Sequence, residues 1–219
     1  SASVIVEAYA ATVADGAPRS FKKAISGGES RQWLRSMKVE FDSLMEKGTG
    51  ELVDLPYGRE PIGCVWVYKK DLNDDGTVRS RLCAMGNQQR EGIDFFETYA
   101  SVVRYDTLRV FLAVAAVEDW DLVQLDVRNA YLNAVLGEHE EVYMRQPPGF
   151  VVAGQERKVY RLWKALYGLK QAARRWRQEL DGFLVSQGFE KLRADDCVYV
   201  KKEGDSILGL TVWVDDLIV

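Results

Sequence analysis

The chain closes with Thr211-Val212-Trp213-Val214-Asp215-Asp216-Leu217-Ile218-Val219, in which two adjacent carboxylates stand inside an apolar run of the kind that forms strands. Burying a carboxylate in such surroundings is costly unless positive charge compensates it. Hard carboxylate oxygens suit Mg²⁺ or Mn²⁺, and a phosphate-bearing substrate often completes the coordination of these ions. The pair therefore predicts a metal-dependent phosphoryl-transfer site.

The backbone around this pair must bend. Neighbouring residues of a regular strand point to opposite faces, so Asp215 and Asp216 can serve one site only if the chain turns there. We predict a tight hairpin turn at the pair, with residues 217–219 starting a return strand that the chain cuts short. Such an edge strand lacks a partner, so we expect the chain to be less stable than a longer parent protein.

A third carboxylate is required from elsewhere, and Asp126 is the best candidate. It follows the apolar stretch 120–125, which is typical of a strand, and it precedes residues 130–132, which could open a helix. Functional sites are commonly built at the carboxyl ends of strands in α/β layouts. The position therefore favours a metal ligand that projects into a cleft.

Composition limits the class of protein. The chain has 219 residues, 47% hydrophobic and 28% charged, which is typical of a soluble globular protein with one elongated domain or two small lobes. No apolar run reaches the length of a membrane span. Three scattered cysteines argue against a zinc site or disulfide framework and favour a reducing compartment, and a single histidine, His139, disfavours histidine-based catalysis. The start, without Met or a basic secretory signal, suggests a piece of a longer polypeptide.

The net charge of −4 hides a basic stretch. Between residues 157 and 178 every charged residue is basic: Arg157, Lys158, Arg161, Lys164, Lys170, Arg174, Arg175 and Arg177. A stretch of one sign on an acidic protein is a candidate phosphate-binding track, whose binding would depend on salt. The alternative is a solvated helix face, since basic runs often have no partner.

Periodicity predicts an α+β fold after a poorly ordered lead-in at 1–28. Helices are expected from 29 to about 47, at 106–118 and at 170–186, the second apolar on most sides and hence central. Strands are expected at 51–55, 64–68, 77–84, 120–125, 141–144, 159–163, 197–201 and 207–214, with a hairpin turn at 73–76. This order is typical of a palm-like sheet with helices packed on one face.

Paired charges also occur elsewhere in the chain. Arg79 and Arg81 are two residues apart on one strand face, where guanidinium groups can hold a phosphate chain, although arginines more often line a wet sheet face. The acidic pairs Asp74-Asp75 and Asp195-Asp196 stand in turn-like or strand-flanking positions, and we expect both pairs to be structural.

Seven ordered segments resemble the reverse transcriptase of copia-type LTR retrotransposons, over roughly residues 20 to 219. The segments are WVYK (66–69), RSRLCAMG (79–86), QREGID (89–94), QLDVRNAYL (124–132), YMRQPPGF (143–150), LYGLKQ (166–171) and VDD (214–216). A lone Asp-Asp would be a weak signal, whereas seven segments in order are specific.

The resemblance implies a fingers-and-palm polymerase fold that ends after the Asp-Asp turn. Residues 29–105 would be mainly fingers, and 106–219 mainly palm with a returning fingers segment around 141–170. It further implies DNA synthesis from deoxynucleoside triphosphates on RNA and DNA templates with a DNA primer, using two Mg²⁺ or Mn²⁺ ions. The expected context is a Pol polyprotein with ribonuclease H and integrase regions, in a cytoplasmic virus-like particle and without membrane contact.

The resemblance also implies roles for single residues. Asp126, Asp215 and Asp216 are similar to the catalytic, metal-binding aspartates, with the Val127 carbonyl as a secondary metal contact. Tyr131 resembles the aromatic gate that excludes a ribose 2′-hydroxyl.

Further residues match substrate-binding positions. Arg79 and Arg81 are expected to hold the incoming triphosphate. The residues expected to line the pocket for the nucleotide and the template are Gly168, Lys170 and Gln171. Those expected to contact nucleic acid are Lys164, Arg174, Arg175 and Arg177. Two alternatives remain: an inactive or domesticated nucleic-acid-binding remnant, which need not keep its aspartates, and another two-metal palm enzyme such as a nucleotide cyclase, which uses no template.

Overall fold

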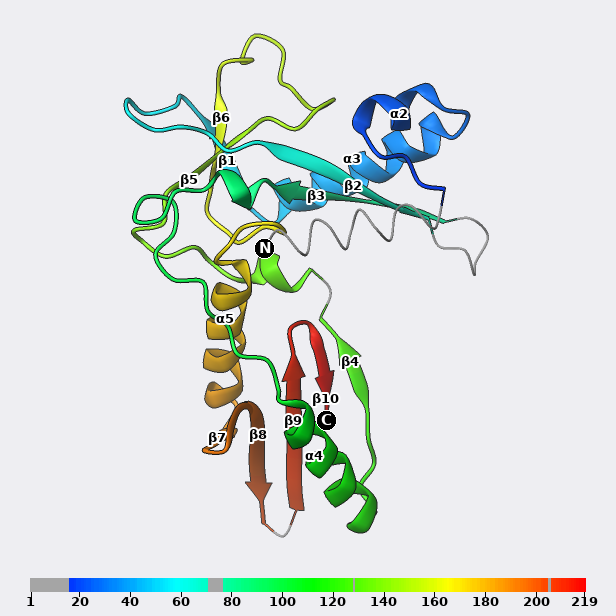
Figure 1. Ribbon diagram of the computed structural model, residues 1–219, viewed down its shortest axis with the longest axis vertical. Helices are drawn as coiled ribbons and strands as arrows, with labels where there is room; N and C mark the ends of the chain where they lie inside the picture. The colour runs from blue at the N-terminus through cyan, green and yellow to red at the C-terminus, as the bar shows by residue number, and fades with distance from the viewer. Residues whose placement is uncertain (1–15, 71–76, 128, 205) are drawn as a thin grey trace.

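The computed structural model describes residues 16–70, 77–127, 129–204 and 206–219, and its mixture of helices and antiparallel sheets agrees with the predicted α+β class. Figure 1 shows an elongated molecule with an upper and a lower part. The turn predicted at 73–76, with its acidic pair, lies outside the described residues, as do residues 1–15 of the predicted lead-in.

The upper part contains elements from two separate stretches of the chain (Figure 1). They are α2 (Phe21–Ser26), α3 (Ser30–Glu46), β1 (Gly50–Val53), β2 (Cys64–Lys70), β3 (Val78–Ala84), the short 3-10 helix η1 (Gly86–Gln88), β5 (Val142–Arg145) and β6 (Val159–Leu162). Strands β2 and β3 form a two-stranded ribbon, while β1, β6 and β5 form a separate antiparallel sheet. The segment 142–162 therefore returns to the first part of the chain.

Helix α3 supports the β2–β3 ribbon through its apolar stripe. Trp33, Met37 and Leu44 are buried on one side of the helix, as the sequence periodicity predicts. The Trp33 ring meets the Tyr68 ring edge-on at 5.3 Å between centroids, and the Tyr68 hydroxyl donates to the Met37 sulfur at 3.4 Å. These contacts hold the ribbon that carries Arg79 and Arg81.

The start of the described chain differs from the prediction of a poorly ordered lead-in. Residues 21–26 form helix α2, whose first turn is capped by the Ser20 hydroxyl accepting from the Lys23 N–H at 3.3 Å. Ala24 is buried, and α2 packs against α3. A short helix of this kind has weak sequence periodicity, so tertiary packing rather than propensity accounts for it.

The lower part is built on one five-stranded antiparallel sheet in the order β4-β10-β9-β8-β7 (Figure 1). Its elements are α4 (Tyr105–Val117), β4 (Gln124–Asp126), the 3-10 helix η2 (Ala130–Asn133) at its upper end, α5 (Ala172–Ser186), β7 (Glu190–Leu192), β8 (Asp195–Glu203), β9 (Ser206–Trp213) and β10 (Asp216–Ile218). Strand β4 is shorter than the predicted strand at 120–125, and β7 was not predicted.

The two helices of the lower part cover opposite faces of this sheet, so the prediction of helices on one face is wrong. Tyr199 of β8, paired with Leu210, donates its hydroxyl to Asp181 of α5 at 3.1 Å. Gly209, which precedes Leu210 in β9, presents the other face, where a Cβ would lie 2.7 Å from the Phe111 ring of α4. The missing side chain at Gly209 makes room for α4 there.

Helix α4 is not central, contrary to the prediction from its apolar composition. Its buried residues are Phe111 and Ala115, whereas Val110 and Val117 are 63% and 81% exposed. A helix that lies against one sheet face buries only the stripe that meets the sheet, whatever the composition of its other sides.

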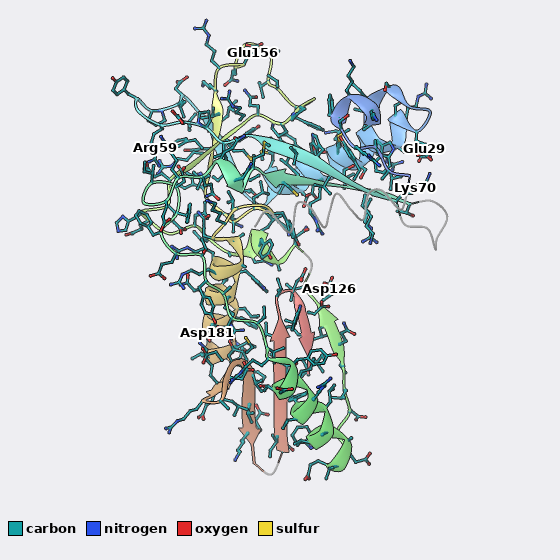
Figure 2. All side chains as sticks on the ribbon, viewed as in Figure 1. Glu29, Arg59, Lys70, Asp126, Glu156 and Asp181 are labelled. Atoms are coloured by element: carbon teal, nitrogen blue, oxygen red, sulfur yellow. The ribbon has the colours of Figure 1, made fainter. Side chains whose placement is uncertain are left out.

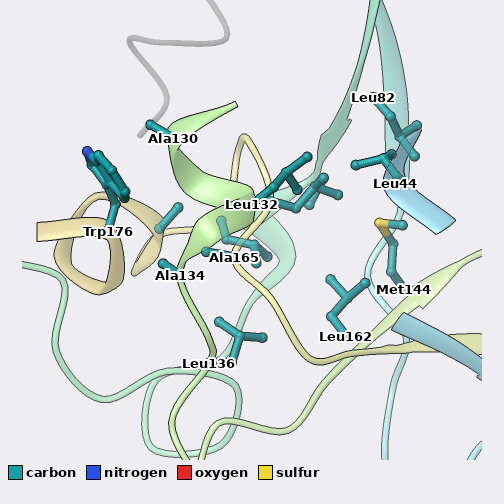
Figure 3. Packing of buried hydrophobic residues seen from close by; sticks show 14 of the residues in the cluster. Leu44, Leu82, Ala130, Leu132, Ala134, Leu136, Met144, Leu162, Ala165 and Trp176 are labelled. Carbon is teal, nitrogen blue, oxygen red and sulfur yellow. The ribbon is translucent and has the colours of Figure 1, made fainter. Parts of the chain in front are cut away.

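One hydrophobic cluster joins the two parts of the molecule (Figure 3). It contains Leu44 of α3, Leu82 of β3, Leu132 of η2, Trp176 of α5 and Leu217 of β10. Because packed interiors deform little, residues at the junction are held in fixed relative positions. Among the described residues, no helix has the length and apolar character needed to cross a lipid bilayer.

Candidate active site

Two of the predicted aspartates face each other across neighbouring strands. Asp126, at the end of β4, is the register partner of Asp216, at the start of antiparallel β10. Directly opposed residues on adjacent antiparallel strands point to the same face. Gln124, two residues before Asp126, donates its side-chain amide to Asp216 Oδ1 at 3.3 Å. Figure 2 shows Asp126 at the upper end of the lower sheet, toward the upper part of the molecule.

The third aspartate lies in the turn between β9 and β10. Trp213 pairs with Asp216, which leaves Val214 and Asp215 as the two turn residues. A tight turn therefore forms as predicted, but Val214 and Asp215 form it, so the turn is shifted by one residue from the Asp215-Asp216 pair. Val214 has a φ of 59°, which is unfavourable for a β-branched residue.

Two hydrogen bonds from other elements hold this turn. The Val127 N–H donates to the Asp215 carbonyl at 2.9 Å, which ties the turn to the segment after β4. The Trp176 indole N–H of α5 donates to the Val214 carbonyl at 2.7 Å. Strained backbone persists where its surroundings over-determine it, and these bonds supply that restraint.

The charges of both other aspartates act on Asp215. Partial burial raises the pKa of Asp215 above its ordinary value, and the negative charges of Asp126 and Asp216 raise it further, while Arg81 opposes the shift. The site therefore concentrates negative charge that a cation would relieve. Among the described residues, however, no three acidic, histidine or cysteine side chains are grouped closely enough to hold a metal ion by themselves.

An aromatic pair lies between the aspartates and the ribbon. The ring of Tyr131, in η2, meets the ring of Tyr167 at 4.6 Å between centroids and an interplanar angle of 63°. The Arg81 guanidinium lies over the other ring, 4.0 Å from the Tyr167 centroid. Burial raises the pKa of Tyr131 to about 12, with smaller contributions from Tyr167 and Asp215.

Arg79 and Arg81 share an exposed face of β3, as predicted from their spacing. They alternate with the buried residues Ser80 and Leu82. The Arg81 guanidinium contacts the aromatic pair through the Tyr167 ring. The ribbon thus brings this guanidinium to the aromatic pair.

The loop 166–171 approaches the ribbon closely. Gly168 has a φ of +91°, and a Cβ there would lie 2.1 Å from the Ala84 carbonyl, so only glycine fits. The Ala84 N–H donates to the Tyr167 carbonyl at 2.7 Å. Lys170 Nζ donates to the Gln89 carbonyl at 3.4 Å and lies 4.5 Å from the Phe95 ring centroid. Gly168 is thus a backbone requirement, and Lys170 is partly engaged within the protein.

Gln171 lies inside the protein, which corrects its assignment as a direct nucleotide contact. Its side chain is fully buried, its Oε1 accepts from Gln89 Nε2 at 3.0 Å, and its Nε2 donates to the Asp94 carbonyl at 2.9 Å. Both polar ends are used by the neighbouring segment 89–94. Gln171 therefore joins two loops rather than lining an open pocket.

The arginines of α5, which are three of the eight basic residues in the predicted track, have partners within the protein. Arg174 pairs with Glu97, and Arg175 donates through Nε to the buried Glu140 at 2.7 Å. Arg177 donates to the Asp196 carbonyl and lies over the Tyr199 ring. Lys164 is half-buried, with its backbone N–H directed to the Thr49 carbonyl.

In the acidic pair Asp195-Asp196, the side chain of Asp195 has a structural role, as predicted. Asp195 is buried and accepts from the backbone N–H groups of Arg104 and Cys197, both at 3.0 Å. These bonds lower the pKa of Asp195 against the opposing effect of its burial. Asp195 thus anchors the segment before α4 to β8.

Sequence reasoning missed two residues at the site. Tyr167 stands between Tyr131 and Arg81, and Trp176 supports the turn that carries Asp215. Tyr167 belongs to the quoted segment LYGLKQ, which was a usable signal. Trp176 lies on the predicted buried stripe of its helix, so nothing in the pattern distinguishes it from an ordinary core residue.

Comparisons with known proteins bear on this arrangement. The family model "Reverse transcriptase (RNA-dependent DNA polymerase)" matches residues 47–219. The chain is 41% identical over 211 residues to the retrovirus-related Pol polyprotein from transposon TNT 1-94 of Nicotiana tabacum, covering 94% of this chain and 16% of that polyprotein.

Further relatives come from a second plant and from yeast. The chain is 37% identical to the Pol polyprotein from transposon RE1 of Arabidopsis thaliana, over 96% of this chain and 14% of the relative. It is 29% identical to the truncated transposon Ty1-A Gag-Pol polyprotein of Saccharomyces cerevisiae, over 87% and 16%. The chain thus spans a small fraction of its relatives' length. It belongs to the reverse transcriptase family, and within that family it is similar to the copia-type retrotransposon polyproteins.

Proposed function

We propose that this chain is the polymerising part of a retrotransposon Pol polyprotein, and that it synthesises DNA from deoxynucleoside triphosphates on RNA and DNA templates by two-metal phosphoryl transfer. The observation that carries the proposal is the placement of the three aspartates at one end of the lower sheet, where Asp126 and Asp216 are register partners and Asp215 lies in the adjoining turn. The upper part corresponds to fingers, with residues 142–162 returning to it, and the lower part corresponds to palm.

The residues present fit a pair of divalent cations. Asp126, Asp215 and Asp216 supply hard oxygen donors, with the Val127 carbonyl proposed as a secondary ligand. Burial raises the pKa of Asp215, the negative charges of Asp126 and Asp216 raise it further, and a bound cation would offset both effects. Mg²⁺ is usually held by one or two carboxylates together with substrate phosphates, so a complete protein cage is not required. Two such ions, when bound, lower the pKa of the primer 3′-hydroxyl and offset charge at the reacting phosphorus.

The protein's own groups then position the substrates. Arg81, and Arg79 on the same strand face, would bind the triphosphate, because guanidinium groups match phosphate oxygens in charge and geometry. The Tyr131 ring would occupy the space that a ribose 2′-hydroxyl needs. Rigid placement of these groups accounts for catalysis without a histidine or cysteine nucleophile.

The alternative of a binding-only remnant finds less support in the structure. That reading depended on an open basic track, and Arg174, Arg175 and Arg177 are engaged within the protein. A cyclase-like enzyme would retain the aspartates but would use no template. Dependence on a template therefore separates polymerase from cyclase.

The proposed partners follow from this activity. They are an RNA template, a DNA primer or product strand, deoxynucleoside triphosphates, and ribonuclease H and integrase regions of the same polyprotein. We propose a virus-like particle in the cytoplasm as the location, since the relatives are transposon polyproteins.

Primer extension on an RNA template tests the proposal. The chain is assayed alone and within a longer segment of its polyprotein, with Mg²⁺ or Mn²⁺. We expect Asp126→Ala or Asp215→Asn to abolish extension, because each removes a proposed metal ligand. Asp121→Ala is the matched control, since Asp121 is exposed in the segment just before β4. Extension that survives either site substitution, or that needs no template, contradicts the proposal.

A further inference from the structure

The Tyr167 ring contacts both Tyr131 and Arg81, two of the residues proposed to bind the nucleotide. We propose that Tyr167 is a specificity-determining positioning residue: its ring fixes both Tyr131 and Arg81, and it thereby sets the preference for deoxynucleoside over ribonucleoside triphosphates. This inference rests on the proposed function.

The ring of Tyr167 contacts two residues that would bind opposite ends of a nucleotide. Toward η2 it meets the Tyr131 ring, which would face the sugar. Toward β3 it carries the Arg81 guanidinium, which would face the triphosphate. One side chain therefore links the two groups that would hold opposite ends of the same substrate.

The backbone of Tyr167 is held by neighbouring segments, so the position of its ring is fixed and the ring can orient the side chains that pack on it. The Tyr167 carbonyl accepts from the Ala84 N–H at 2.7 Å. The next residue, Gly168, is locked at a positive φ against the Ala84 carbonyl, and its own carbonyl lies 2.1 Å from where a Cβ of Gly86 would stand. Small residues on both sides thus allow the loop and the ribbon to pack directly, backbone against backbone.

The backbone of Tyr131 is held within a short element, where its carbonyl accepts from the Ala134 N–H at 3.1 Å. It lies in η2, a short 3-10 helix that begins after Asn129 in the left-handed conformation, with a φ of 54°. Short 3-10 segments have poor hydrogen-bond geometry, so the ring's position depends on its packing. Edge-to-face contact with Tyr167 supplies part of that packing.

Arg81 is placed by the same ring. Its guanidinium stacks on an aromatic face, which orients the planar group without neutralising its charge. Removing the Tyr167 ring would free the guanidinium and release the gate together. Selectivity against the 2′-hydroxyl should then fall more than the rate with the correct substrate.

The test measures kcat/KM for a deoxynucleotide and for the matching ribonucleotide during primer extension. We expect Tyr167→Ala to lower the ratio of the two values at least about tenfold and to raise KM for the deoxynucleotide, while Tyr167→Phe stays within about twofold of the parent. In the background of Tyr131→Ala, Tyr167→Ala should relax selectivity no further. Tyr57→Ala, at a fully exposed tyrosine, is the control.

The outcomes are distinguishable. If Tyr167→Ala lowers kcat/KM for both nucleotides equally, or relaxes selectivity fully on top of Tyr131→Ala, the inference is overturned. Tyr167→Leu, which fills the space without an aromatic face, replaces Tyr167→Ala if the latter does not fold, with the same expected loss of selectivity. A parent protein that extends no primer refutes the proposed function instead.

Discussion

The Arg175–Glu140 pair offers a sharp test of whether the basic residues of α5 are structural. Glu140 is 5% exposed, and its Oε2 accepts from Arg175 Nε at 2.7 Å and from the Gly137 N–H at 2.9 Å. Arg175→Ala removes the charged donor and leaves a buried carboxylate with one backbone partner. We expect the substitution to lower the free energy of unfolding substantially.

The magnitude follows from the burial of the two partners. Breaking a fully buried ion pair costs about 3–5 kcal/mol, because one charge remains buried without compensation. The Arg175 side chain is 27% exposed, so water can reach part of the space that its removal opens. We therefore expect a loss of about 2–3 kcal/mol, which corresponds to roughly 5–10 °C in the midpoint of thermal unfolding for a chain of this size.

Urea denaturation of Arg175→Ala, Glu140→Gln and the variant with both substitutions measures the interaction energy of the pair. The double variant carries no unpaired carboxylate at position 140. Lys38→Ala is the control, because Lys38 and Asp42 form an exposed i,i+4 pair that should contribute only about 0.3–0.5 kcal/mol. A loss for Arg175→Ala no larger than that of the control would refute the reasoning. A weaker salt dependence of template binding with unchanged stability would restore the basic-track interpretation.

Three further predictions concern the site. Trp176→Phe keeps the ring but removes the donor to the Val214 carbonyl; it should cost about 1 kcal/mol in urea denaturation and lower kcat of primer extension more than it changes KM, and an unchanged kcat would count against a positioning role. Tyr131→Ala should admit ribonucleotides, and incorporation assays that show unchanged discrimination would argue against the gate. Asp215→Asn should raise the thermal midpoint at neutral pH: the pKa of Asp215 is raised, so its ionised form opposes folding above the ordinary value of 3.8, and the gain should vanish as the pH falls below that value. Mg²⁺ should stabilise the parent more than this variant, and equal midpoints at neutral pH would contradict the described crowding of charge.

Much of the fold and the placement of the aspartates could be predicted from local pattern. The apolar stripe of α3, the strands that carry Arg81 and Trp213, and the turn before Asp216 follow from periodicity and from the alternation of side chains in strands. Asp126 was expected at the end of a strand and lies there. These features depend on residues near each other in sequence, so the sequence alone determines them.

Other features depended on partners that are distant in sequence. Composition could not show that α4 buries only the stripe around Phe111, because that depends on which sheet face it meets. In the sequence, Arg174 and Arg175 indicate a free charged surface. In the folded chain they pair with Glu97 and Glu140, which are distant in sequence.

The same limit applies at the site itself. Sequence determined that three aspartates end up near turns and strand ends, and it supplied Tyr131 and Arg81 as candidates. Only the tertiary structure decided that Gln171 is buried and that Tyr167 stands between the other two side chains. The physical reason is that the sequence pattern shows which face of a helix or strand a residue occupies. Which residues contact that face depends on the segment, distant in sequence, that packs against it.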